Sequence, residues 1–182
     1  MDGSHIQIVE SYSDYRPPFN ASKVVRTLLR TVPERYLRGL DCVVLVNQAF
    51  LSRRNVGSRV RSRKDAFGKL QVLGRYHFAS HGKPPWIEIF VDRIIGDIHP
   101  RIIIWIPPLR AICFAHVLYH EIGHHIHDFI RPEYSEKEGM ADRWSTTLMG
   151  SFLRKQYWYA MWPLILFGKM RRLLFPPKVR LT

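Results

Sequence analysis

The chain has 182 residues, a formal net charge of +13 at pH 7 and only two cysteines. This length is typical of one domain with a substantial core, and two cysteines exclude the disulfide framework of small secreted proteins. Cys42 and Cys113 lie among apolar residues, so we expect buried thiols and a reducing, cytoplasmic setting. No signal peptide is visible, and the longest apolar run, residues 157–167, is too short for a membrane-spanning helix.

The positive charge is concentrated in two segments. Residues 52–64 and 143–182 together hold 14 of the 28 basic residues and no acidic residue. Because the rest of the chain is close to neutral, these segments are expected to attract nucleic acid, an anionic membrane surface or an acidic protein. Glycine and serine residues within the first segment indicate that it forms a solvated loop. Its basic residues are Arg53, Arg54, Arg59, Arg61, Arg63 and Lys64.

The first half of the chain predicts a strand, a helix and a second strand. Residues 6–12 read as a short strand, and Asn20 is a good N-cap for a helix whose apolar residues recur with helical spacing from Val24 to Val32. A further turn over residues 34–38 should end at Gly39. Residues 41–46 form a continuous apolar run, which predicts a buried strand.

The middle of the chain predicts a strand pair and then a long helix. Residues 70–78 and 86–91 have strand character, with the turn His-Gly-Lys-Pro-Pro between them. Pro107-Pro108 would start a helix over residues 108–129. At 100° per residue, its apolar residues fall within an arc of about 120°, nearly opposite His120 and His124. The predicted buried residues are Phe114, Ala115, Leu118, Ile122, Ile126 and Phe129.

The helix carries the zinc-hydrolase signature His-Glu-x-x-His at residues 120–124. Residues four apart lie on one helical face, so His120 and His124 can bind one Zn²⁺. Glu121 would stand beside the reactive water as the catalytic base. A catalytic zinc site needs a third protein ligand and an open fourth position.

Glu138 and Asp142 are the candidates for the third ligand. Residues 135–138, Ser-Glu-Lys-Glu, also read as a capping box that opens a second helix, which gives Glu138 a purely structural interpretation. In the catalytic interpretation Glu138 binds zinc, and Asp142, one turn later, orients a ligand imidazole. The alternative makes Asp142 the ligand, and we rank Glu138 first.

The motif followed by Glu138-x-x-x-Asp142 resembles the gluzincin metallopeptidases. Residues 138–144, Glu-Gly-Met-Ala-Asp-Arg-Trp, are similar to the corresponding segment of the ImmA/IrrE-like metallopeptidases. The resemblance covers residues 24–152 in layout and is specific over residues 120–142. It implies a zincin-like α+β fold, with a small mixed or antiparallel sheet packed on an active-site helix and a second ligand helix. We expect residues 1–153 to form this single domain. It also implies an intracellular regulatory protease acting on a protein or peptide. In an aspzincin-like arrangement Asp142 would be the ligand, although the aspzincin threonine is absent.

In zinc peptidases a strand beside the metal helix holds the extended substrate by backbone hydrogen bonds. Residues 86–90 are our candidate for that strand, and residues 101–106 compete for the place. An oxyanion stabiliser is also expected; its candidates are Tyr134, Tyr157, Tyr159 and Arg143. We interpret His116 and His127 as supporting or surface residues, and place His125 at the edge of the packed face.

Residues 154–182 form a basic, aromatic carboxy-terminal tail. Aromatics beside cations are typical of an interfacial membrane anchor, whereas a helix packed on the domain is the simpler interpretation. Pro163 should break any long helix there. The alternative to a peptidase is a non-catalytic, zinc-stabilised domain that binds nucleic acid, an anionic membrane or a regulatory protein through its basic segments.

Overall fold

The computed structural model describes residues 6–50, 72–80, 82–130 and 137–174. The basic residues 53–64, Tyr134 and the first part of the expected capping box lie outside these ranges. Within them the chain forms an α+β structure, as expected.

The strands form one mixed sheet in the order β1-β2-β4-β3. The first three in that order are parallel, whereas β3 runs antiparallel to β4, with Tyr76 opposite Ile87. The predicted strands are thus present, and the predicted pairing of the third and fourth is confirmed. Their bounds are Gln7–Ser11 for β1, Cys42–Val46 for β2, Gly74–His77 for β3 and Trp86–Phe90 for β4.

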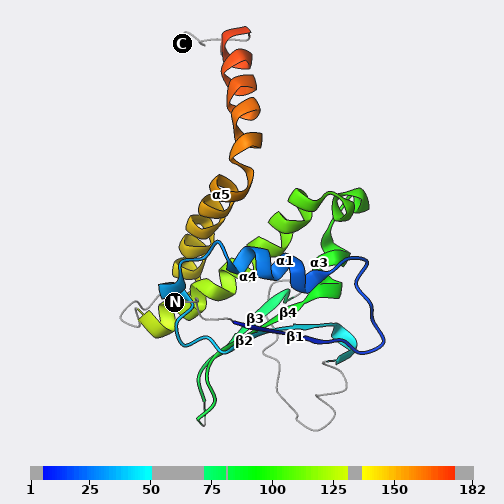
Figure 1. Ribbon diagram of the computed structural model, residues 1–182, viewed down its shortest axis with the longest axis vertical. Coiled ribbons are helices and arrows are strands. Elements are labelled where there is room, and N and C mark those ends of the chain that lie inside the picture. Colours follow the sequence, from blue (N-terminus) through cyan, green and yellow to red (C-terminus); the bar gives the residue numbers. More distant parts are fainter. Residues whose placement is uncertain (1–5, 51–71, 81, 131–136, 175–182) are drawn as a thin grey trace, which may run out of the picture.

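Two helices cover one face of this sheet (Figure 1). Helix α1, Ala21–Leu29, begins at the predicted N-cap, where the Asn20 Oδ1 accepts a 2.7 Å hydrogen bond from the Lys23 backbone N–H. Helix α4, Pro107–Ile130, begins at the predicted proline pair and carries the motif. It packs against α1, β3 and β4, so the motif helix is held by most of the domain's core.

The buried face of α4 largely matches the predicted arc. Leu118, Ile122 and Ile126 are fully buried, and so is Tyr119, whose hydroxyl lies 2.8 Å from the Thr31 Oγ1. Each fully buried aliphatic side chain stabilises the fold by about 1.5–3 kcal/mol. The expectation was wrong for Phe129, which is half exposed because it lies at the rim, stacked on the His125 ring.

One predicted strand ends a residue early, and two local expectations were wrong. The β4 strand stops at Phe90, and Val91–Asp97 forms the short helix α3. The apolar run Arg101–Trp105 is the 3₁₀ helix η3 rather than a strand, although its composition suits either. Pro163 does not break the last helix, α5, Lys137–Leu174. A proline removes one hydrogen bond and crowds the preceding turn, and α5 bends upstream, with non-helical φ/ψ angles at Tyr157.

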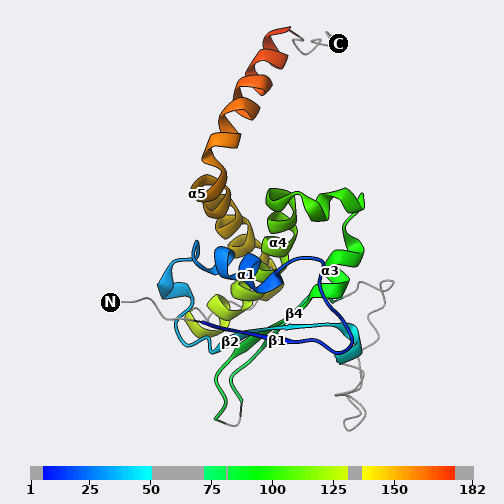
Figure 2. The ribbon, with the colours of Figure 1, turned by 45° about the vertical axis from the view of Figure 1, so that its right-hand side comes forward.

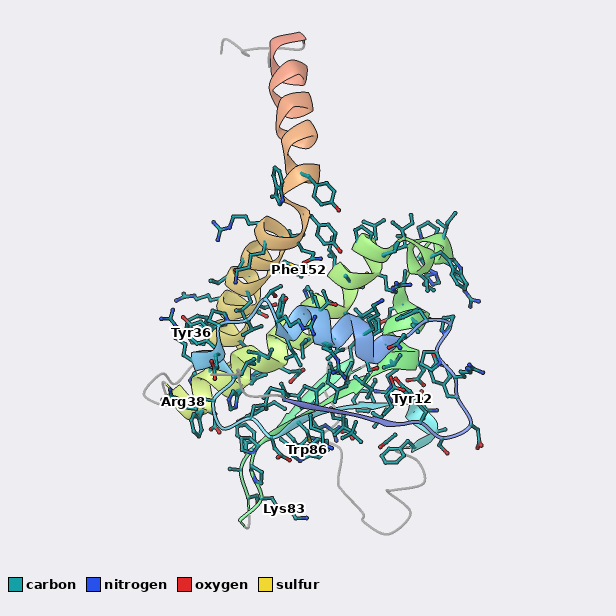
Figure 3. The ribbon with its side chains drawn as sticks, viewed as in Figure 1. Tyr12, Tyr36, Arg38, Lys83, Trp86 and Phe152 are labelled. Atoms are coloured by element: carbon teal, nitrogen blue, oxygen red, sulfur yellow. The ribbon has the colours of Figure 1, made fainter. Side chains whose placement is uncertain are left out.

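Helix α5 packs along α4 and then leaves the body of the domain (Figures 1 and 2). Phe152 is fully buried just before the bend (Figure 3), and the Lys155 Nζ donates a 3.1 Å hydrogen bond to the Thr31 backbone carbonyl. Beyond the bend, α5 extends away from the sheet. The helix thus continues past residues 153–154, where the boundary between the domain and the carboxy-terminal tail was expected. Among the described residues, none of the helices combines the length and apolar character needed to cross a bilayer.

Candidate metal centre

Helix α4 presents the two motif histidines one above the other. Their rings meet edge to face with centroids 4.7 Å apart, and the two Nε2 atoms are 3.1 Å from each other. Opposite this pair, the buried face of the same helix is fixed in the core by residues such as Leu118. The histidines are therefore presented by a helix that cannot easily rotate or shift.

Close packing of α5 on α4 brings the acidic residues to the histidines. At Gly123, inside the motif, an added Cβ would lie 2.6 Å from the Ala141 backbone oxygen and 2.7 Å from the Ala141 Cα. Only glycine permits this approach, because atoms in ordinary contact lie about 3.5–4.0 Å apart. As a result, the Glu138 Oε2 lies 3.5 Å from the His120 Nε2 and 3.6 Å from the His124 Nε2.

The spacing of these three atoms suits a tetrahedral zinc site. Donor atoms bound to zinc at about 2.1 Å lie about 3.4 Å from one another in a regular tetrahedron. The measured separations between the donor atoms of His120, His124 and Glu138 are 3.1, 3.5 and 3.6 Å. Glu138 is largely exposed, which leaves the solvent side of the group open. Three donors and one open side are the composition of catalytic rather than structural zinc sites.

Asp142 contacts the outer nitrogen of the first histidine. Its Oδ1 lies 2.9 Å from the His120 Nδ1, which can donate its proton to the carboxylate and leave Nε2 free as a ligand atom. Such a carboxylate fixes the tautomer and orientation of a metal-binding imidazole. The structure therefore brings both acidic candidates to the histidines, with Glu138 on the Nε2 side and Asp142 on the Nδ1 side.

Glu121 lies on the sheet side of the histidines, against β3. It is buried, and burial raises its pKa from 4.5 to about 7, although a charge on His120 and a hydrogen bond from the Tyr76 backbone N–H lower it. An added Cβ on Gly74 would lie 2.8 Å from the Glu121 Oε1, so glycine makes room for this carboxylate. A carboxyl group whose pKa lies near neutrality is suited to both accepting and returning a proton.

A polar network that sequence spacing does not indicate joins α4 to β3. The Tyr76 hydroxyl lies 3.2 Å from the His125 Nδ1 and donates toward Asp128 at 3.4 Å, while the His125 Nε2 lies 3.1 Å from the Arg38 backbone oxygen. His125 was expected at the edge of the packed face but is fully buried; burial lowers its pKa. The ring therefore connects α4 to β3 and to the chain before β2.

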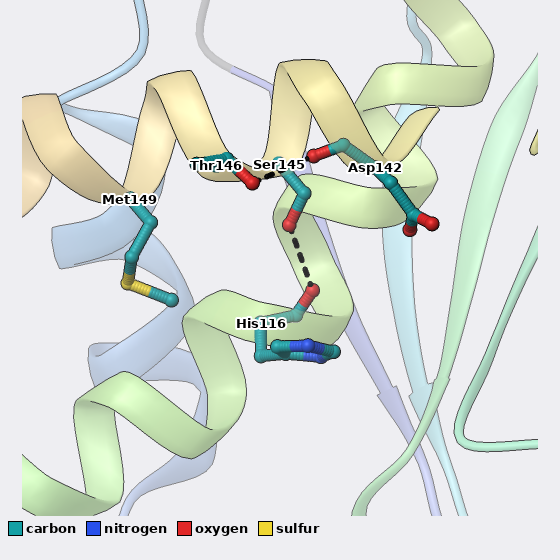
Figure 4. Close-up of a pocket in the computed structure, with 5 residues that line it drawn as sticks. All are labelled: His116, Asp142, Ser145, Thr146 and Met149. Atoms are coloured by element: carbon teal, nitrogen blue, oxygen red, sulfur yellow. Dashed lines mark hydrogen bonds between the residues drawn. The ribbon is translucent and has the colours of Figure 1, made fainter. Parts of the chain in front are cut away.

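His116 lies one turn before His120, beside a pocket of about 360 Å³ between α4 and α5 (Figure 4). Asp142, Ser145 and Met149 line the same pocket from α5, together with Thr146. The His116 side chain is exposed, as expected. The four-residue step from His116 to His120 was visible in the sequence, but the pocket depends on the course of α5, which sequence spacing does not reveal.

The candidate oxyanion stabilisers that the structure describes lie at different distances from the histidines. Tyr157 and Tyr159 lie on the same helix as Asp142 but about 22 Å or more further along its axis, too far to reach the histidines. Arg143 is exposed and follows Asp142 directly, and Tyr134 lies outside the described residues. Of the described candidates, Arg143 alone adjoins a residue that contacts the histidines. His127, expected to support the site or lie at the surface, is buried.

The structure contradicts the choice of substrate strand. The predicted strand, β4, is an inner strand with β2 on one side and β3 on the other, so its backbone is already paired. The competing segment is a 3₁₀ helix. Instead, β3 lies at the edge of the sheet formed by the described strands, and it is this edge strand that packs beside α4.

Comparison with protein-family models, curated protein sequences and solved structures gives no match.

Proposed function

We propose that the chain is a zinc-dependent metallopeptidase with a zincin-like fold, acting as a regulatory protease on a protein or peptide substrate. One observation carries this proposal: the His120, His124 and Glu138 donor atoms are spaced as a tetrahedral zinc site requires, with Glu121 buried at their side. The resemblance of the motif to the gluzincin and ImmA/IrrE-like metallopeptidases supports the same proposal.

The residues of the candidate site have separate roles in the proposed peptide hydrolysis. His120, His124 and Glu138 would hold the ion, which when bound lowers the pKa of water and polarises the scissile carbonyl. Glu121 accepts the proton of the attacking water and donates it to the leaving amine, so the carboxyl group ends the cycle in its starting state. Asp142 holds the His120 ring in the tautomer that leaves Nε2 free.

The edge strand β3 is the proposed support for an extended substrate. Its outer edge faces no other described strand, and its position beside α4 would let an extended peptide lie along it with the scissile bond next to Glu121. The contact between Glu121 and the Tyr76 N–H fixes the base relative to that strand. The pocket beside His116 is large enough to receive one side chain of the peptide.

The proposal is tested by replacing Glu121 with glutamine in zinc-loaded protein. Hydrolysis of a quenched fluorescent peptide library should fall by at least about 100-fold, the usual scale of general acid–base catalysis, while zinc content stays at one per chain. Glutamine keeps the size of the side chain but cannot accept the proton. Wild-type-like hydrolysis by this variant would contradict the assignment of the base.

The same experiment separates the peptidase from a non-catalytic domain in which zinc only joins α4 to α5. Such a domain would bind zinc equally well in the wild type and in Glu121→Gln, and neither protein would cleave any of the peptides. The zinc ligands would remain correct in that case, and the function would be assigned to the basic segments instead.

A further inference from the structure

Exposed apolar side chains gather where η3 runs into α4. Ile102 and Trp105 are each 65% exposed, and Ile106 and Leu109 are exposed to a lesser degree. In a 3₁₀ helix residues three apart eclipse one another, so Ile102 and Trp105 project from the same face of η3. Large apolar groups exposed together indicate an interaction surface, whereas single ones do not.

The inner side of η3 is fixed by contacts with the body of the domain. Ile104, on the inner side of η3, is buried, and its backbone oxygen accepts a 3.1 Å hydrogen bond from the Arg110 Nη1. The Arg110 guanidinium also lies over the Phe19 ring, 4.3 Å from its centroid. The exposed residues of η3 are therefore presented by an ordered element.

A second exposed aromatic pair lies near the same end of the domain. Trp158 and Tyr159 follow the bend in α5 and are 62% and 59% exposed. Burial raises the pKa of the preceding residue, Tyr157, and the charge of the nearby Arg110 opposes that rise. Figures 1 and 2 show the bend of α5 and the start of α4 rising from the same side of the domain, away from the β3–β4 hairpin.

The two segments that carry these groups hold basic residues and no acidic ones. Residues 98–120 and 143–182 contain no acidic residue, and Arg101 and Arg154 are exposed beside the two apolar groups. Cations are attracted to the surface of an anionic bilayer, and Trp and Tyr favour the interface between water and lipid.

We propose that η3, the start of α4 and the aromatic pair after the bend of α5 form a docking surface for an anionic lipid bilayer. Ile102 and Trp105 insert between the headgroups, and the flanking cations bind the lipid charge. The net charge of +13 disfavours a second copy of the chain as occupant. Nucleic acid would leave the aliphatic side chains Ile102 and Ile106 without apolar partners.

Co-sedimentation of the 182-residue chain with vesicles tests the proposal. We expect binding to phosphatidylcholine vesicles that contain phosphatidylserine, a marked loss at high salt, and weak binding to phosphatidylcholine alone. Trp105→Ser should weaken binding about tenfold, because it removes the largest inserting group. Phe78→Ser is the matched control: Phe78 is also an exposed aromatic, but it lies at the hairpin near Lys83, at the far end of the domain (Figure 3).

Circular dichroism establishes that both variants are folded before binding is compared. Equal loss in Trp105→Ser and Phe78→Ser would overturn the proposal, and so would unchanged binding in Trp105→Ser. Failure of the wild-type chain to bind anionic vesicles at low salt, or its binding to duplex DNA but not to vesicles, would also overturn it. None of these outcomes depends on zinc or on hydrolysis.

Discussion

Replacing Gly123 with alanine should weaken zinc binding without touching a ligand. The new Cβ would lie 2.6 Å from the Ala141 backbone oxygen, so α5 must move away from α4 by about 1 Å to restore ordinary contact. Glu138 and Asp142 move with α5, whereas His120 and His124 stay on α4. Zinc sites tolerate deviations of only about 0.2 Å in ligand distance, so this displacement separates the third ligand from the other two.

We expect the zinc affinity of Gly123→Ala to fall at least tenfold, or about 1.4 kcal/mol, in competition with a chromophoric chelator. Overpacking should also lower the free energy of unfolding of the metal-free protein by about 1–3 kcal/mol. The matched control is Gly150→Ala on α5, where an added Cβ meets no atom within 4 Å. That change should preserve zinc affinity and stabilise the helix by about 0.5–1 kcal/mol. Full zinc affinity in a folded Gly123→Ala protein would refute the reasoning.

Three further changes probe the site and its support. Gly74→Ala places a Cβ 2.8 Å from the Glu121 Oε1, so kcat/KM should fall at least tenfold at unchanged zinc content; unchanged kcat/KM would contradict the role of this glycine. Asp142→Asn should lower zinc affinity about 10- to 100-fold, measured by chelator competition, because a neutral amide orients the imidazole less strongly. Tyr119→Phe loses the 2.8 Å contact with Thr31 and should reduce unfolding stability by about 1 kcal/mol in urea, with zinc affinity unchanged.

The elements with strong local signals were predictable from sequence. The cap at Asn20, the apolar run of β2 and the proline start of α4 are decided by neighbouring residues, and each appears in the structure. The order of the strands was not predictable, because pairing joins residues far apart in the chain. The choice of β4 as the substrate strand failed for that reason: its place between β2 and β3 is a property of the whole sheet.

The candidate site also combines a feature that depends on neighbouring residues, which was predictable, with features that depend on the tertiary structure, which were not. A four-residue step on one helix is enough to bring His120 and His124 together, and that expectation required no tertiary information. Glu138 reaches them only because α5 crosses α4 at Gly123. Glycine inside a helix costs about 1 kcal/mol relative to alanine, so its presence within the motif was a usable signal of close packing. The room that Gly74 leaves for Glu121 had no comparable local signal.

The most direct test of the account is the zinc content per chain of wild type, Glu138→Ala and Asp142→Ala, purified without a histidine tag and supplied with zinc before dialysis against a weak chelator. We predict one zinc in wild type, loss of most of it in Glu138→Ala, and a smaller loss in Asp142→Ala, which keeps all three ligands. Loss confined to Asp142→Ala would transfer the third ligand to that residue. A wild-type chain that holds no zinc under these conditions would contradict the metal centre itself.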